Sequence, residues 1–158
     1  IAARSSYSSA SMLNTGPLPP QVNAETKYTI TWSLSNRYNS LSGARVTATL
    51  PGYVDWKGVV FPSSENVSFN SNTREVSWDV GRVQAGIGQS SSPQEMSFQV
   101  GLVPSISQVG SAPNLVQDIK VRAQDDFTNT VLTDSANSVT TLIQNDPIYI
   151  RDLEIVVQ

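Results

Sequence analysis

The sequence predicts an all-β protein folded as an antiparallel β-sandwich, and three observations support this fold class. Apolar and polar residues alternate with a period of two along most of the chain, whereas helical periodicity is almost absent. The alternating runs recur about every 10 to 15 residues, with Gly, Pro, Asn and Ser between them. Serine and threonine make up roughly a fifth of the residues, which suits strands whose outer faces carry hydroxyl groups.

The size and charge of the chain limit the classes of protein it can belong to. At 158 residues it has room for one sandwich with extra terminal strands. The net charge is -3 and the basic residues are scattered, so the basic stripe of a nucleic-acid-binding protein is missing. No apolar run approaches the length of a bilayer span. We therefore expect neither a nucleic-acid partner nor direct insertion into a membrane.

The chain contains no cysteine and no histidine. The usual zinc ligands, thiol nucleophiles and the commonest general base are thus missing. We expect a non-catalytic protein with no cofactor and no metal, in which a packed core without disulfides holds the fold.

Four strands are predicted by regular alternation. The first covers residues 28–35 and directs Tyr28, Ile30, Trp32 and Leu34 to one face, with only Thr and Ser on the other. The other three are 44–50, ended by Pro51-Gly52; 75–80, ended by Gly81 and carrying Trp78; and 96–102, closed by Pro104. We expect Trp32 and Trp78 to share one core.

Shorter runs predict the remaining strands. Asn70-Ser71-Asn72 is typical of a hairpin turn between two of them. The shorter strands are expected at residues 53–60, 66–70, 115–124, 127–133 and 138–144.

The chain divides by composition into three parts. Residues 1–21 are predicted as an N-terminal extension that ends in the Pro-rich linker 16–20, residues 22–145 as the sandwich, and residues 146–158 as a strand-like C-terminal tail. Because the chain begins at Ile1 with no signal-like segment, we expect a mature product or an excised fragment.

Several of these segments, in order and spacing, resemble the conserved-repeat Ig-like domain of prokaryotic surface proteins. The matching segments are Tyr-Thr-Ile-Thr-Trp at 28–32, Asn36, the strand 44–50 with Pro51-Gly52, and Val-Ser-Trp-Asp-Val-Gly at 76–81. Residues 14–20 and the strand around Phe98 look most like tandem copies in very large surface proteins of uncultured bacteria.

The resemblance covers residues 14–147 and implies an immunoglobulin-like sandwich in an extracellular, structural protein. The family has no assigned catalytic residues. We therefore expect a structural module of an extracellular surface array or fibre, whose partners are other copies of itself or adjacent Ig-like domains. The alternative is an adhesin-type domain that binds a surface glycan or protein; an accessory domain of a secreted enzyme has less support.

The C-terminal tail is the predicted assembly strand, with apolar residues that follow an apparently closed domain. These residues are Ile148, Ile150, Leu153, Ile155 and Val157. Such a strand can be added to the sheet edge of a neighbouring copy. Two alternatives are that the tail folds back on its own domain or begins the next domain of a longer chain.

A second candidate site is the long, polar loop 84–93, since binding residues often lie on loops of a rigid sandwich. Its candidate ligand residues are Gln84, Gly86, Gly88 and Gln89, although a flexible connection is the commoner role of such a loop. Trp56 joins this set as a possible exposed platform for a sugar ring.

Four aspartates could bind calcium through carboxylate oxygens, although solvated turns explain them more simply because no EF-hand spacing is present. They are Asp118, Asp125, Asp126 and Asp134.

Overall fold

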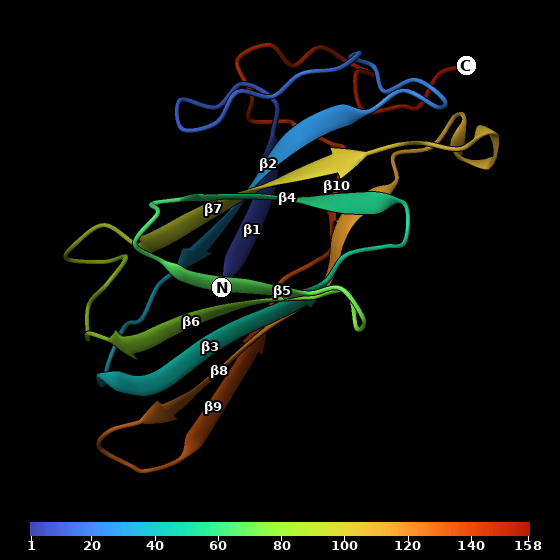
Figure 1. The fold of residues 1–158 in the computed structure, drawn as a ribbon. Helices are drawn as coiled ribbons and strands as arrows, with labels where there is room; N and C mark the ends of the chain where they lie inside the picture. Colours follow the sequence, from blue (N-terminus) through green and yellow to red (C-terminus); the bar gives the residue numbers. More distant parts are fainter.

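The computed structural model describes residues 1–158 and confirms the predicted all-β class, with two antiparallel sheets packed face to face (Figure 1). None of its helical segments has the length and apolar character of a membrane span. The elements are β1 (Ala2–Ser6), β2 (Thr26–Leu34), β3 (Leu41–Thr49), β4 (Val54–Phe61), β5 (Asn66–Asn70), β6 (Glu75–Val83), β7 (Gln94–Leu102), a 3₁₀ helix (Ile106–Gln108), β8 (Asn114–Asp125), β9 (Val131–Ser135) and β10 (Val139–Thr140).

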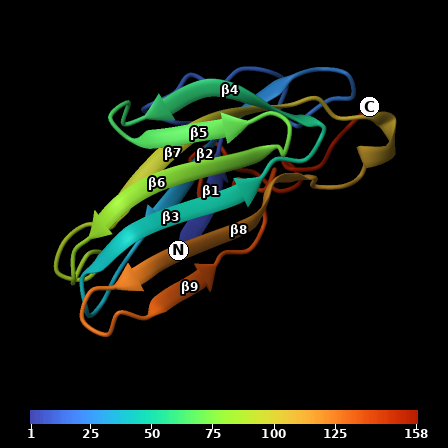
Figure 2. The same ribbon diagram turned by 60° about the horizontal axis from the view of Figure 1, so that its bottom comes forward.

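The strand order is that of an immunoglobulin-like sandwich. One sheet has the order β1-β2-β7-β4, which matches strands A, B, E and D of that fold, while β3, β8 and β9 match strands C, F and G. The hairpin β5–β6 is inserted between the D and E positions and extends the second sheet beyond β3. Figure 2 shows the resulting order β5, β6, β3, β8, β9 across this sheet.

The alternating residues of both sheets form one core. Trp32 and Trp78 are fully buried in it, as the sequence predicted. The Trp32 ring meets Phe98 edge to face, with 5.0 Å between ring centroids. The Trp78 indole Nε1 donates a hydrogen bond of 2.7 Å to the carboxylate of Glu65. Each indole thus lies between the sheets, and the Trp78 N–H keeps a polar partner.

The N-terminal segment 1–21 belongs to the sandwich and does not form a separate extension or linker. Its strand β1 pairs antiparallel with β2 along all five residues. Asn14 is buried and donates hydrogen bonds to Tyr7 O (2.9 Å) and Thr29 Oγ1 (2.8 Å), while its own side-chain oxygen accepts one from Gln99 (2.8 Å). This network fixes Asn14, just ahead of the Pro-rich stretch, onto the outer face of β2 and β7.

The strand-like conformation predicted for the tail is wrong, because residues 146–155 form a series of turns. The end of the tail docks on its own subunit instead. Val156 is 1% exposed and exchanges backbone hydrogen bonds with Gly110 and Ser111, both 2.9 Å. Val157 accepts from Val22 N at 3.1 Å and donates to Pro20 O at 2.9 Å. The tail therefore closes one end of the sandwich.

Asp146 ties the two terminal segments together. Its carboxylate accepts hydrogen bonds from the backbone amides of Tyr7 (2.7 Å), Ser8 (2.6 Å) and Ile148 (3.1 Å). Burial alone would raise the pKa of this carboxyl group, but the amides of Ile148, Ser8 and Tyr7 outweigh burial and lower the pKa.

Replacing Trp32 or Trp78 by Ala should lower the free energy of unfolding by about 3 to 5 kcal/mol, because each change leaves a cavity in the core. Tyr38→Ala is the control: its ring is 75% exposed, so a change within about 0.5 kcal/mol is expected. Denaturant titration followed by circular dichroism measures these changes. Tryptophan variants as stable as the Tyr38 variant would contradict the packing.

Replacing Val156 by Ala should lower the free energy of unfolding by about 2 kcal/mol, since two buried methyl groups are lost at the docking site of the tail. Ile150→Ala, on a side chain that is 65% exposed, should change it by less than about 0.5 kcal/mol. Equal stabilities of the two variants would mean that the tail is detached in solution.

Candidate functional site

The predicted ligand loop, 84–93, lies at one end of the sandwich and is held in place by its neighbours. The backbone amide of Asn36 donates to Ile87 O at 2.8 Å, and the Asn36 side chain donates to Gln84 O at 3.1 Å. These bonds join the loop to the β2–β3 connection. Gln84 is thus fixed through its backbone, while its side chain stays exposed.

The other three loop residues shape the turn. Gly86 and Gly88 have φ of 83° and 81°, a left-handed conformation that favours glycine. A Cβ at Gly88 would lie 2.4 Å from the Cβ of Ser35, so the loop also needs glycine for its close approach to the start of the β2–β3 connection. When the side-chain oxygen of Gln89 faces Arg37, it accepts hydrogen bonds from the guanidinium Nε at 2.9 Å and Nη2 at 3.1 Å. A ligand at this loop stays a prediction.

Asp125 organises the neighbouring turn between β8 and β9. Its carboxylate accepts from the amides of Phe127 (2.8 Å) and Thr128 (2.9 Å) and from the side chain of Asn39 (2.9 Å). The Thr128 amide first, and then the Asn39 side chain, hold the pKa of Asp125 below its usual range. Because this turn occupies residues 126–130, the strand predicted at 127–133 begins only at Val131.

The four aspartates considered for calcium therefore have separate positions. Asp126 forms an ion pair with Arg82 at 3.3 Å, which joins the β8–β9 turn to the end of β6. Asp118 lies along β8 and Asp134 on β9. No group of three or more acidic residues could hold a metal ion together.

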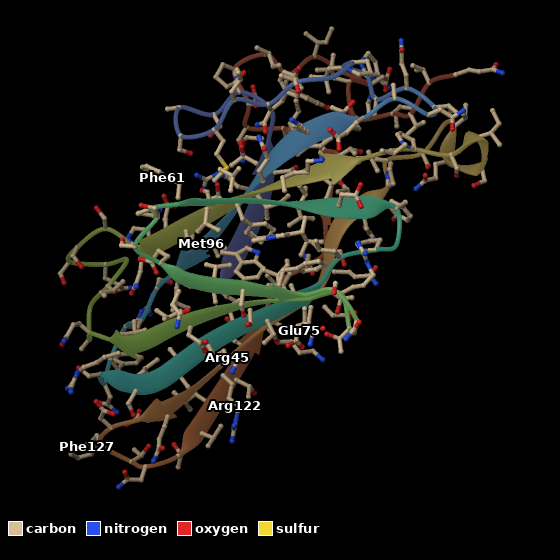
Figure 3. The ribbon with its side chains drawn as sticks, viewed as in Figure 1. Arg45, Phe61, Glu75, Met96, Arg122 and Phe127 are labelled. Carbon is tan, nitrogen blue, oxygen red and sulfur yellow. The ribbon has the colours of Figure 1, made fainter.

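Trp56 is neither exposed nor part of the loop end. It lies in β4, half-buried, with its ring stacked on Phe69 at 5.7 Å between centroids and tilted against Phe98 at 5.2 Å. The indole closes the side of the sandwich between β4 and β5. Two aromatic rings in the linked loops are exposed, Tyr38 (75%) and Phe127 (83%), and Figure 3 labels Phe127 at this end.

The five predicted assembly residues do not form one continuous face. Ile148 and Ile150 are 43% and 65% exposed, Leu153 and Ile155 are half-buried, and Val157 lies in the bridge to Gln21. The tail is consequently occupied within its own subunit and is not a free strand in this structure.

The most exposed strand is β9. All five of its residues are exposed, including Val131 (51%) and Leu132 (45%), and its only paired neighbour is β8. Beside it, an apolar groove of about 300 Å³ opens between the sheets. The apolar residues that line this groove are Ile1, Leu34, Leu41, Ala44, Val121, Ala123 and Leu132.

The outer face of the same sheet carries a basic groove of about 690 Å³. Arg45 on β3 lies directly opposite Arg122 on β8, and Lys120 is the next outward residue on β8 (Figure 3). Arg45 is balanced by Asp79, 3.3 Å away. The face thus presents positive charge to solvent.

Comparison with known proteins yields distant structural neighbours. No family model matches the chain, and no curated protein matches it. A variant of BcpA, the major pilin subunit of Bacillus cereus, is 16% identical with a TM-score of 0.49, over 78% of this chain and 36% of that one. The full-length major pilin SpaD from Corynebacterium diphtheriae is 16% identical with a TM-score of 0.47. The match covers 76% of this chain and 32% of that one.

An uncharacterised protein from Nocardia farcinica with an immunoglobulin-like fold is 15% identical with a TM-score of 0.33, over 76% of this chain and 81% of that one. The chain spans about a third of the length of the two pilin subunits.

Replacing Asp125 by Asn should change how stability depends on pH. Because the folded pKa of Asp125 is lowered, its carboxylate stabilises the fold above its ordinary pKa of about 3.9, and this contribution disappears as the pH falls through the folded value. The variant should have a lower melting temperature than the wild type at pH 7, and this difference should decrease toward zero as the pH falls.

Thermal melts at a series of pH values measure this effect. Tyr38→Ala, at an exposed position in the neighbouring β2–β3 connection, serves as the control and should keep a constant small difference in melting temperature from the wild type. If the difference in melting temperature between the wild type and Asp125→Asn stays constant into strong acid, the Asp125 carboxylate does not stabilise the fold through these hydrogen bonds.

Proposed function

We propose that this chain is a structural module of an extracellular surface array or fibre, whose copies associate through the edges of the sheet that contains β3 and β8. The observation that carries the proposal is β9, which is exposed along its whole length and pairs with a single neighbour. An edge strand of this kind presents unpaired N–H and C=O groups that another strand can bind.

The best partner for β9 is β5 of the next copy. The two are the outermost strands of the same sheet, on opposite edges, and each has five residues. Side by side, they would bring Leu132 of one copy near the apolar Val67 and Phe69 of the other on the core side. On the outer side, Thr133 would lie near Ser68.

This contact joins two different surfaces, so the copy whose β9 is bound keeps a free β5 edge, and the copy whose β5 is bound keeps a free β9 edge. A heterologous contact that does not close into a ring produces an open filament. Such growth would extend one sheet from copy to copy through main-chain hydrogen bonds.

Other modes of association have less support. Packing two copies through the outer face of this sheet would bring Arg45, Lys120 and Arg122 against their equivalents, which costs electrostatic energy. Donation of the tail would require Val156 to leave its buried position. The extracellular, surface location rests on the resemblance of residues 14–147 to the conserved-repeat Ig-like domain.

Engineered cysteines test the contact, because the chain contains no cysteine of its own. With Thr133→Cys and Ser68→Cys in one chain, the central residues of β9 and β5 should form intermolecular disulfides on mild oxidation, since neighbouring strands lie about 4.8 Å apart, a separation that a disulfide can span. Non-reducing gels should then show a ladder of oligomers.

The matched control pairs Thr133→Cys with Val59→Cys on β4, an exposed edge position of the other sheet. This variant should give no ladder. A ladder of equal yield from the control would indicate random collision and contradict the proposal. If the single variant Thr133→Cys forms dimers and the double variant gives no ladder, the contact joins the β9 strands of two copies. That result would contradict the proposed β9–β5 contact.

A further inference from the structure

A row of four side chains crosses the outer face of the sheet β1-β2-β7-β4. Arg4 lies opposite Thr31, Thr31 opposite Ser97, and Ser97 opposite Phe61. Because neighbouring strands lie about 4.8 Å apart, the row extends for roughly 14 Å. A groove of about 450 Å³ runs over all four residues.

Phe61 is the unusual member of this row. Its ring is 52% exposed at the end of β4, and it forms no pair with another aromatic ring, unlike Trp56 in the same strand (Figure 3). Its neighbours across the sheet carry hydroxyl groups. A large apolar ring left open to solvent on a hydroxylated face contributes little to the core, and its flat face is accessible to a ligand.

The rest of the groove is polar and rigid. Thr31 and Ser97 share a hydrogen bond of 2.9 Å, and Arg4 pairs with Glu95 at 3.5 Å. Serines of the segment 6–11 form one wall, and the backbone of that wall is held by Asp146 through Ser8 N at 2.6 Å. The groove is thus built by four strands and both terminal segments.

We propose that this groove binds a neutral polysaccharide chain, with Phe61 stacked on the C–H face of one pyranose ring. The ring supplies an apolar platform, while the Thr31 and Ser97 hydroxyls and the Arg4–Glu95 pair donate and accept hydrogen bonds to sugar hydroxyl groups further along the row. A row of roughly 14 Å accommodates a few linked sugar units.

The charges of the groove select a neutral ligand. Glu95 and Asp146 balance Arg4, so the lining has no excess of positive charge to attract an acidic polymer. The basic groove on the other sheet, around Arg45 and Arg122, has the opposite character and no aromatic side chain. A peptide ligand is less suited to this lining, since only Phe61 and Ala10 along it are apolar besides the prolines.

This binding site is independent of the proposed assembly, because β9 and β5 belong to the other sheet. Affinity electrophoresis in native gels tests it, with a β-1,3-glucan, a β-1,4-mannan, a β-1,4-xylan and an α-1,6-glucan as neutral probes and alginate as the acidic one. We expect at least one neutral polysaccharide, and not alginate, to slow the protein.

Phe61→Ala should weaken that retardation about tenfold, since the stacking platform is lost, while Phe61→Tyr should keep it. Phe127→Ala is the matched control, because Phe127 is also exposed (83%) but lies in the β8–β9 turn. It should bind as the wild type does. Circular dichroism confirms that each variant is folded.

A second pair of variants tests the far end of the row. Arg4→Gln should also weaken binding, whereas Arg151→Gln, on a side chain that is 93% exposed in the tail, should not. The proposal is wrong if no neutral polysaccharide in the panel slows the protein, if alginate alone does, or if the Phe61 and Phe127 variants weaken binding equally.

Discussion

The structure depends on burial of the inner faces of two sheets, because the chain has no disulfide to hold it. Alternation places every second residue of β2, β3, β6, β7 and β8 between the sheets, and the largest buried side chains, Trp32 and Trp78, come from opposite layers. The outer faces carry hydroxyl groups, amides and scattered charges. Because the core is formed by the inner faces alone, the outer faces and the sheet edges remain accessible. Both proposed binding surfaces, the β9 and β5 edges and the groove over Phe61, lie there.

One open side of the sandwich is closed by aromatic side chains and the other is not, and this difference decides where another molecule can bind. Between β4 and β5, the stacked rings of Trp56 and Phe69 close the gap between the sheets. Between β1 and β9, an apolar groove stays open, and β9 is exposed on both faces. Proteins usually protect edge strands with charges, bulges or cover, and β4 has a bulge around Gly58. In β9, Asp134 is the single charged residue, and its carboxylate pairs with the amino group of Ile1 at 2.8 Å.

The terminal segments contribute structure that local patterns do not describe. Asp146 binds amides of residues 7 and 8 from more than 130 positions away, and Val156 and Val157 lie between residues 20–22 and 110–111. These bonds make the tail part of its own subunit. They also fix the serine-rich segment 6–11 as one wall of the groove over Phe61.

The sequence by itself determined the fold class, most strand positions and the burial of Trp32 and Trp78, because alternation with a period of two is a local property that each strand carries in its own residues. Tertiary structure decided the rest. Apolar spacing in the tail predicted a strand, but backbone partners far along the chain favoured turns. Trp56 was predicted as the exposed platform and packs on Phe69, which alternation cannot reveal because the two lie in different sheets. Phe61 was missed because the predicted strand ended at Val60, although the same alternation directs it outward. Its neighbours in the groove come from three other strands and both ends of the chain, and only folding brings them together.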